Sequence, residues 1–303
     1  MAPITTGTHP KLLWPGIKAI WGNTYKDQPL GYTKVFDQET SSKAYEETVE
    51  LAGFGLAPVK PEAQSVSYDT TVNGYTTRFT NVAYALGFII SQEAVDDNQY
   101  EEQAGRRAKA LKRSMRQTME WVHANVLNRA TDSNYVGGDG VSLLNASHPT
   151  ASGLQSNVLA VAADLSEAAL EDALIMLRTA KDTRGLIMAL QGKKLIVPPN
   201  LEFEAERILK STLQNDTANN AINALRSSGS LPEGVMSWSF LTDTDQWFVK
   251  TDAPDGLKTF MRKELSFDKD SDFDTGNYKH KAYVRFSCGW DDWRTVVGSP
   301  GAA

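Results

Sequence analysis

The sequence holds one cysteine, Cys288, among its 303 residues, and it has no apolar run near the roughly 18 residues that a membrane-spanning helix needs. A single thiol excludes an intrachain disulfide and a cysteine-rich metal site. The first residues also lack the basic start, apolar run and small-residue cleavage site of a secretory signal. We therefore expect a soluble protein that is made in a reducing cytoplasm and has no membrane partner.

Catalytic and cofactor motifs are missing as well. The four histidines share no metal-ligand spacing, and there is no Gly-x-Ser-x-Gly, phosphate-binding loop or dinucleotide fingerprint. His148 precedes Pro149 in a loop, which favours a structural role. Cys288 lies beside Gly289 at an apolar strand end, which favours a core position over a nucleophile. We expect neither enzymatic activity nor a cofactor.

An excess of basic residues is also absent: the net charge is −6, which argues against a general nucleic-acid-coating surface but allows local basic patches. One short acidic segment contains Asp268, Asp270, Asp272 and Asp274. It resembles a calcium loop, yet the EF-hand pattern needs glycine where Phe273 stands and glutamate where Lys279 stands. We favour a solvated strand edge over a cation site.

The most prominent feature is a stretch from Tyr100 to Arg129 that predicts one helix about 45 Å long. Its apolar residues recur at steps of three and four: Ala104, Ala108, Leu111, Met115, Met119, Val122 and Val126. Nearly opposite lies a basic stripe: Arg106, Lys109, Lys112, Arg113 and Arg116. The stripe could contact phosphates, face solvent, or pair with acidic neighbours, and we favour the last of these.

The N-terminal region carries large side chains without a core pattern of its own. Trp14 and Trp21 precede an acidic, half-buried segment with Glu46, Glu47 and Glu50, whose glutamates are the candidate partners of the basic stripe. Large apolar groups on such an arm pack either on their own domain or on another subunit. The sequence leaves both open.

The segment from Ser65 to Phe79 predicts a β-hairpin. Asn73-Gly74 is a strong signal for a type I′ turn, because both residues tolerate positive φ. That register places one set of side chains on a common face: Tyr68, Val72, Tyr75 and Phe79. An isolated two-stranded hairpin is marginal in water, so this face needs a partner surface.

The remainder predicts a mixed α+β organisation. Residues 160 to 250 contain a helix capped by Asp164 or Ser166, a strand Lys194–Val197 and a helix Leu201–Leu213. Two adjacent strands are expected at Met236–Thr242 and Gln246–Thr251. A further strand alternates cleanly over His280–Phe286.

Taken together, several short motifs resemble the major head subunits of Mu-like tailed phages, which have the Hong Kong 97-type capsid fold. They are Met115-Arg-Gln-Thr-Met119, Asn125-Val-Leu-Asn128, Gly137-Gly-Asp-Gly140, Ser147-His-Pro149, Asp164-Leu-Ser-Glu-Ala-Ala169, Val197-Pro-Pro199, Trp247-Phe-Val-Lys-Thr-Asp252, Phe273-Asp-Thr-Gly276, Gly289-Trp-Asp-Asp-Trp-Arg294 and Gly298-Ser-Pro-Gly301. The resemblance covers residues 110 to 301 and is weak over the first 60.

The resemblance implies an α+β fold in four parts. Residues 1–50 would be an N-terminal arm, 51–90 an E-loop, 91–160 with 252–303 a peripheral domain containing a long spine helix, and 161–251 an axial domain. Subunit interfaces are then expected on the arm (Trp14, Trp21, Glu46, Glu47, Glu50) and on the E-loop (Tyr68, Val72, Tyr75, Phe79).

The implied function is that of a major capsid protein whose pentamers and hexamers form an icosahedral head around double-stranded DNA. Its expected partners are itself, a separate scaffolding protein (because no long charged helix precedes the arm), a portal protein and weakly bound DNA. It would be assembled in the host cytoplasm and reside in the virion capsid. The alternative is a monomeric binding module, such as a head-decoration protein or an adhesin.

Overall fold

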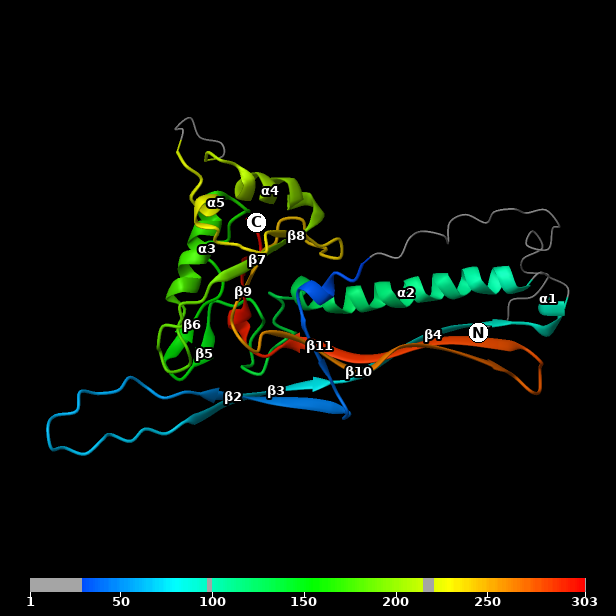
Figure 1. Ribbon diagram of the computed structural model, residues 1–303, viewed down its shortest axis with the longest axis horizontal. Helices are drawn as coiled ribbons and strands as arrows, with labels where there is room; N and C mark the ends of the chain where they lie inside the picture. Colours follow the sequence, from blue (N-terminus) through cyan, green and yellow to red (C-terminus); the bar gives the residue numbers. More distant parts are fainter. Residues whose placement is uncertain (1–28, 97–99, 215–220, 303) are drawn as a thin grey trace.

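The structure, a computed structural model, describes residues 29–96, 100–214 and 221–302. Figure 1 shows an elongated molecule in which one long helix lies along a sheet of long strands, with a second α/β unit at one end and a ribbon projecting past it. The predicted α+β class is confirmed. Trp14 and Trp21 lie outside the described residues.

The long helix, α2 (Tyr100–Asn128), ends one residue before the predicted boundary and follows the short helix α1 (Gln92–Asp96). Leu111, Met115 and Met119 are all buried, as the apolar stripe predicts. They face a four-stranded sheet in the order β1-β10-β11-β4. Helix and sheet share one hydrophobic core.

This first sheet is built largely from distant parts of the chain. Its members are β1 (Asp37–Thr40), β10 (Leu257–Ser271), β11 (Tyr278–Trp290) and β4 (Val82–Ile90). β1 runs parallel to β10, and the other pairs are antiparallel. Ala282, Val284 and Phe286 on β11 are buried, which confirms the alternation predicted for that strand.

The second sheet has the order β12-β9-β7-β8 and carries its own core. Its strands are β12 (Val296–Ser299), β9 (Trp247–Thr251), β7 (Gly192–Val197) and β8 (Val235–Ser237). The helices of this unit are α3 (Glu167–Thr179), α4 (Glu202–Lys210) and α5 (Ala224–Ser228). The side chain of Ser166 caps α3 by accepting a hydrogen bond from the Ala169 amide at 3.2 Å.

Two predictions for this unit are wrong in detail. The strands expected at Met236–Thr242 and Gln246–Thr251 are not neighbours, because β7 lies between β8 and β9 and β8 ends at Ser237. The chain leaves the sheet there, and the Trp238 indole bonds to Glu120 on α2. The helix expected from Leu201 begins as a 3-10 turn, Pro199–Leu201, before α4.

The predicted hairpin turn at Asn73-Gly74 is also wrong. Both residues lie inside one continuous strand, β3 (Val72–Thr80), which pairs antiparallel with β2 (Tyr45–Ala52). A strand 20 residues upstream thus replaces the local partner that the turn signal suggested. A Cβ at Gly74 would collide with the Glu50 side chain, so the glycine serves a close approach between strands.

Short elements complete the fold: β5 (His148–Thr150), β6 (Gly153–Gln155), and the 3-10 turns η2 (Tyr32–Lys34) and η4 (Trp293–Thr295). η2 packs on α2, where Tyr32 stacks on His123 with ring centroids 3.9 Å apart. Phe286 of β11 stacks on the other side of this imidazole at 5.1 Å. His123 therefore joins helix, sheet and N-terminal segment.

Burial of the His123 ring favours its neutral form. Nδ1 donates to the Met119 carbonyl at 2.6 Å, and Nε2 accepts from the Thr259 hydroxyl at 2.9 Å. Burial lowers the pKa of His123 to about 4. Since the unfolded chain protonates near its ordinary value of 6.5, this group contributes stability above that pH and loses it as the pH falls toward 4.

We therefore expect the melting temperature to drop between pH 6.5 and pH 4, with about 3 kcal/mol of unfolding free energy lost through His123. His123→Gln should be less stable at pH 7 and should show a flatter profile across this window, measured by circular dichroism. His280→Gln, at a half-buried histidine, should flatten it less. Equal profiles for His123→Gln and the parent chain would contradict the assignment.

Candidate assembly surfaces

A loop of residues 53–71 joins β2 to β3 and projects well beyond the rest of the molecule (Figure 1). Its large apolar side chains are mostly in solvent: Phe54, Leu56, Val59, Val66 and Tyr68 are 60%, 83%, 93%, 59% and 94% exposed. Monomeric proteins rarely expose so many apolar groups on one segment. The loop is a candidate contact surface, and it includes Tyr68, a predicted E-loop residue with an almost fully exposed side chain.

The base of this projecting loop is held by Arg184. Its Nε donates to the Gly53 carbonyl at 2.9 Å, and its Nη2 donates to the Thr70 carbonyl at 2.6 Å and to both carboxylate oxygens of Asp69. One side chain thus connects the two arms of the ribbon to the second α/β unit. Asp69 also accepts from the Gly55 amide, and these hydrogen bonds, with Arg184, lower its pKa.

Two predicted interface residues of the E-loop are instead packed against their own chain. Phe79 is 4% exposed and contacts Phe260, with ring centroids 5.0 Å apart. Tyr75 is half-buried against Gly138, and burial, with nearby Asp292, raises its pKa. At these two positions the hairpin face therefore finds its partner surface within the chain. Val72 pairs in register with Ala52, so it belongs to the ribbon.

The three predicted glutamates also have partners in the chain. Glu46 accepts from the Ser41 hydroxyl at 2.8 Å and lies 3.8 Å from Lys43, while Glu47 forms an ion pair with Arg78 at 2.6 Å. Glu50 lies 3.8 Å from Arg294 of η4. Within the described residues of one chain, the basic partners of these three glutamates are Lys43, Arg78 and Arg294, none of which lies on α2. The interpretation that the glutamates pair with the basic stripe is therefore wrong within one chain.

The basic stripe itself lies along α2 as predicted. Lys109 and Lys112 are exposed, and Arg113 and Arg116 are half-buried. For Arg106 only the helical backbone is described. The exposed lysines lie beside the ends of β4, β10 and β11, where they border a groove lined also by Phe88 and Phe267. Sequence reasoning missed this groove, because it is formed by segments far apart in the chain.

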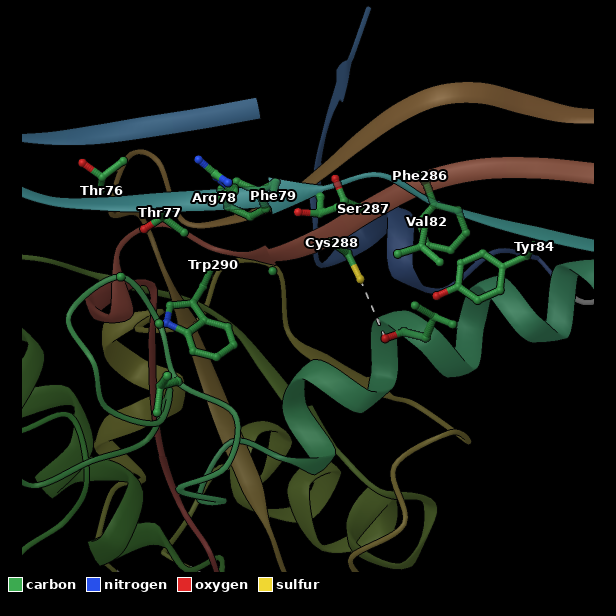
Figure 2. A pocket seen from close by; sticks show the side chains of 16 residues that line it. Thr76, Thr77, Arg78, Phe79, Val82, Tyr84, Phe286, Ser287, Cys288 and Trp290 are labelled. Atoms are coloured by element: carbon green, nitrogen blue, oxygen red, sulfur yellow. Dashed lines mark hydrogen bonds between the residues drawn. The ribbon is translucent and has the colours of Figure 1, made fainter. Parts of the chain in front are cut away.

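A second cavity, of about 380 Å³, lies where β3 crosses β11 near the end of α2 (Figure 2). The thiol of Cys288 points into the protein and donates to the Val122 carbonyl at 3.8 Å. Burial raises the pKa of Cys288 to about 12, so the reactive thiolate is scarce at neutral pH. Cys288 is half-buried and packs against the first hydrophobic core.

Known capsids share this architecture. The phage capsid protein family matches residues 74–299, which is most of the chain. The chain belongs to the phage capsid protein family. No curated protein sequence matches it significantly.

Solved capsid structures superimpose on this chain over nearly its whole length. A native gene-transfer-agent (GTA) particle capsid superimposes with a TM-score of 0.61 at 11% identity, covering 95% of each chain. The capsid of cyanophage P-SCSP1u gives 0.59 at 9% identity, covering 99% of this chain and 95% of the other. Microbacterium phage Oxtober96 gives 0.57 at 9% identity, with 99% and 100% covered. These structures confirm the predicted fold, and the family match confirms a phage capsid protein.

Two polar residues singled out from the sequence, His148 and Asp272, make contacts within the chain. His148 is fully buried, contacts Asp139 through Nδ1 at 2.6 Å and stacks on Trp293 at 4.1 Å, which agrees with the structural role predicted for it. In the acidic segment, Asp272 forms an ion pair with Lys279 at 2.6 Å.

Among the described residues, no group of three or more His, Cys, Asp or Glu is placed to hold a metal ion. Within the same ranges, no helix has the length and apolar character to span a membrane.

Removing the Arg184 contacts should loosen the projecting loop without unfolding the subunit. We expect Arg184→Ala to raise the rate of chymotrypsin cleavage at Tyr68 by roughly three- to tenfold, since the loop base loses its hydrogen bonds and opens more often. Arg178→Ala, at an exposed arginine near the end of α3, is the matched control and should leave the rate unchanged. Equal cleavage rates for the two variants would show that Arg184 does not hold the loop.

Proposed function

We propose that this chain is the major capsid subunit of a tailed phage, and that its pentamers and hexamers build an icosahedral head around double-stranded DNA. The observation that carries the proposal is the exposed apolar loop 53–71, which has a fixed base and a tip far from its own core. A subunit of a closed shell needs such a surface to reach a neighbour. The family match supports the same reading.

The division into functional parts follows the strand pairing. We take β2 and β3 with their loop, residues 45–80, as the E-loop, because these strands pair with each other whereas β4 pairs with β11. Residues 1–44 would then be the arm. The peripheral domain would contain α2 with β4, β10 and β11 of the first sheet, to which the arm adds β1. The axial domain would contain residues 161–251 together with β12, which pairs with β9.

The proposed partners are further copies of this chain, a scaffolding protein, a portal protein and the packaged DNA. A net charge of −6 favours weak contact with DNA, because a strongly basic lining would bind phosphates tightly. The exposed Lys109 and Lys112 would make only local contacts. Assembly would take place in the host cytoplasm. The alternative of a monomeric decoration protein or adhesin has no support from the comparisons.

The direct test is electron microscopy with sizing of the protein expressed alone and together with its neighbouring phage genes. Closed shells, or pentamers and hexamers, are the expected result. A stable monomer under every condition would overturn the proposal.

Replacing the exposed apolar groups of the loop should abolish assembly but leave the subunit folded. We expect the triple variant Leu56→Ser, Val59→Ser and Tyr68→Ser to keep the melting temperature of the unassembled subunit, since each side chain is at least 83% exposed. Shell yield should fall at least tenfold, because burying each group in an interface is worth about 1.5–3 kcal/mol.

The matched control changes polar residues of the same loop, Gln64→Ala, Ser65→Ala and Ser67→Ala, and should assemble normally. Shells formed by the apolar triple variant at the parent yield would show that the loop is not the assembly surface.

A further inference from the structure

The far end of the β10–β11 hairpin presents an isolated aromatic side chain. Phe273 lies in the turn after Ser271 and is 99% exposed, although the turn itself is well formed. The Asp272 amide donates to the Asn277 carbonyl, and the Gly276 amide, at a positive φ of 65°, donates to the Asp272 carbonyl, each at 2.8 Å. Residues 270–276, called the tip below, contain three aspartates and neither lysine nor arginine.

A groove of opposite character lies on the same hairpin, nearer the body. It has a volume of about 430 Å³ and runs between α2 and the strands β4, β10 and β11. Its apolar lining consists of Phe88, Ala108, Leu111 and Phe267. Its remaining lining residues are His280, Asp268 and four lysines: Lys109, Lys112, Lys269 and Lys281. The lysines are exposed.

The tip cannot reach the groove of its own chain. β10 and β11 stay paired in register as far as Ser271 and Tyr278, so the hairpin does not fold back. Phe273 is five residues beyond Asp268 of the groove, roughly 17 Å along an extended chain. Any tip that enters this groove must come from another copy.

We propose that the acidic tip of one capsid subunit inserts Phe273 into this groove of a second copy, where the rim lysines face its aspartates. The contact rests on the proposed capsid function and adds an interface separate from the loop 53–71. Because tip and groove lie on one hairpin, two copies about a two-fold axis can each fill the other's groove.

Charge selects this occupant over the other exposed segments of the chain. Residues 1–28, with Trp14 and Trp21, contain three lysines and one aspartate, so the basic rim would repel them. The loop 53–71 contains one lysine, one glutamate and one aspartate, a much weaker match. The tip combines three aspartates, of which Asp272 is also paired with Lys279, with an exposed aromatic ring that suits an apolar groove.

The contact can be tested by disulfide trapping in assembled particles. Chains with Phe273→Cys and chains with Lys109→Cys are co-assembled, oxidised and separated on a non-reducing gel. A crosslinked pair is expected, and the native Cys288, whose thiol has a raised pKa, should leave parent particles uncrosslinked. Lys109→Cys is also paired with Ile17→Cys for the arm and with Val59→Cys for the loop. Phe273→Cys with Arg178→Cys, on the other α/β unit, is the negative control.

The proposal would be overturned if Lys109→Cys crosslinked to the arm or loop cysteine and not to Phe273→Cys. It would also be overturned if intact particles formed without any crosslink at Phe273→Cys, a result that would leave the proposed capsid function standing. Failure of the parent chain to form shells in any condition would overturn both.

A charge exchange gives an independent readout. Asp274→Lys and Lys109→Glu should each lower shell yield roughly fivefold at low salt, and the double variant should restore it, because the exchanged pair attracts again. If the lysine served packaged DNA or a different partner, the double variant would assemble no better than Lys109→Glu alone. That outcome would overturn the pairing.

Discussion

Glu120 occupies the buried face of α2, where it is 4% exposed. Its carboxylate accepts from the Gly31 amide and from the Trp238 indole, the latter at 2.8 Å. A buried carboxylate costs several kcal/mol unless such donors are present. Since one donor precedes η2 and the other follows β8, Glu120 is satisfied only when both segments reach α2. The helix therefore fixes the second sheet relative to the first through a polar requirement as well as apolar packing.

The projecting ribbon depends on this fixed frame. A two-stranded ribbon alone is marginal, and here its root is stabilised by Phe79 on Phe260 and by Arg184 from the second α/β unit. The apolar side chains of the loop 53–71, beyond that root, remain in solvent. Fixing the base lowers the conformational entropy that a neighbour must remove on binding, which is the physical advantage of preorganisation. The β10–β11 hairpin is organised in the same way, with a packed base and an exposed end that carries Phe273.

The parts predictable from sequence were those fixed by local periodicity. The 29-residue helix and the alternating strand β11 were correct because one face of each meets a continuous core. The Asn73-Gly74 turn failed because its signal is local, whereas β2 offered a longer pairing that includes the Glu47–Arg78 ion pair. Pairing between strands distant in sequence also created the contacts of Arg184 and the groove beside α2. No spacing rule in one sequence reports which distant segments meet, so the burial of Phe79 and Tyr75 could not be foreseen.

The sizes of the exposed surfaces suit a shell that must close without errors. Each is a short segment: the loop 53–71 with its exposed apolar groups, and the tip with one phenylalanine among aspartates. Contacts of this kind dissociate readily on their own, so a wrongly placed subunit can leave before its neighbours trap it. Symmetry then repeats each modest contact many times, and the closed shell becomes stable although no pair is tight. The overall negative charge adds repulsion between subunits, which makes the complementary patches, and hence the register of assembly, more selective.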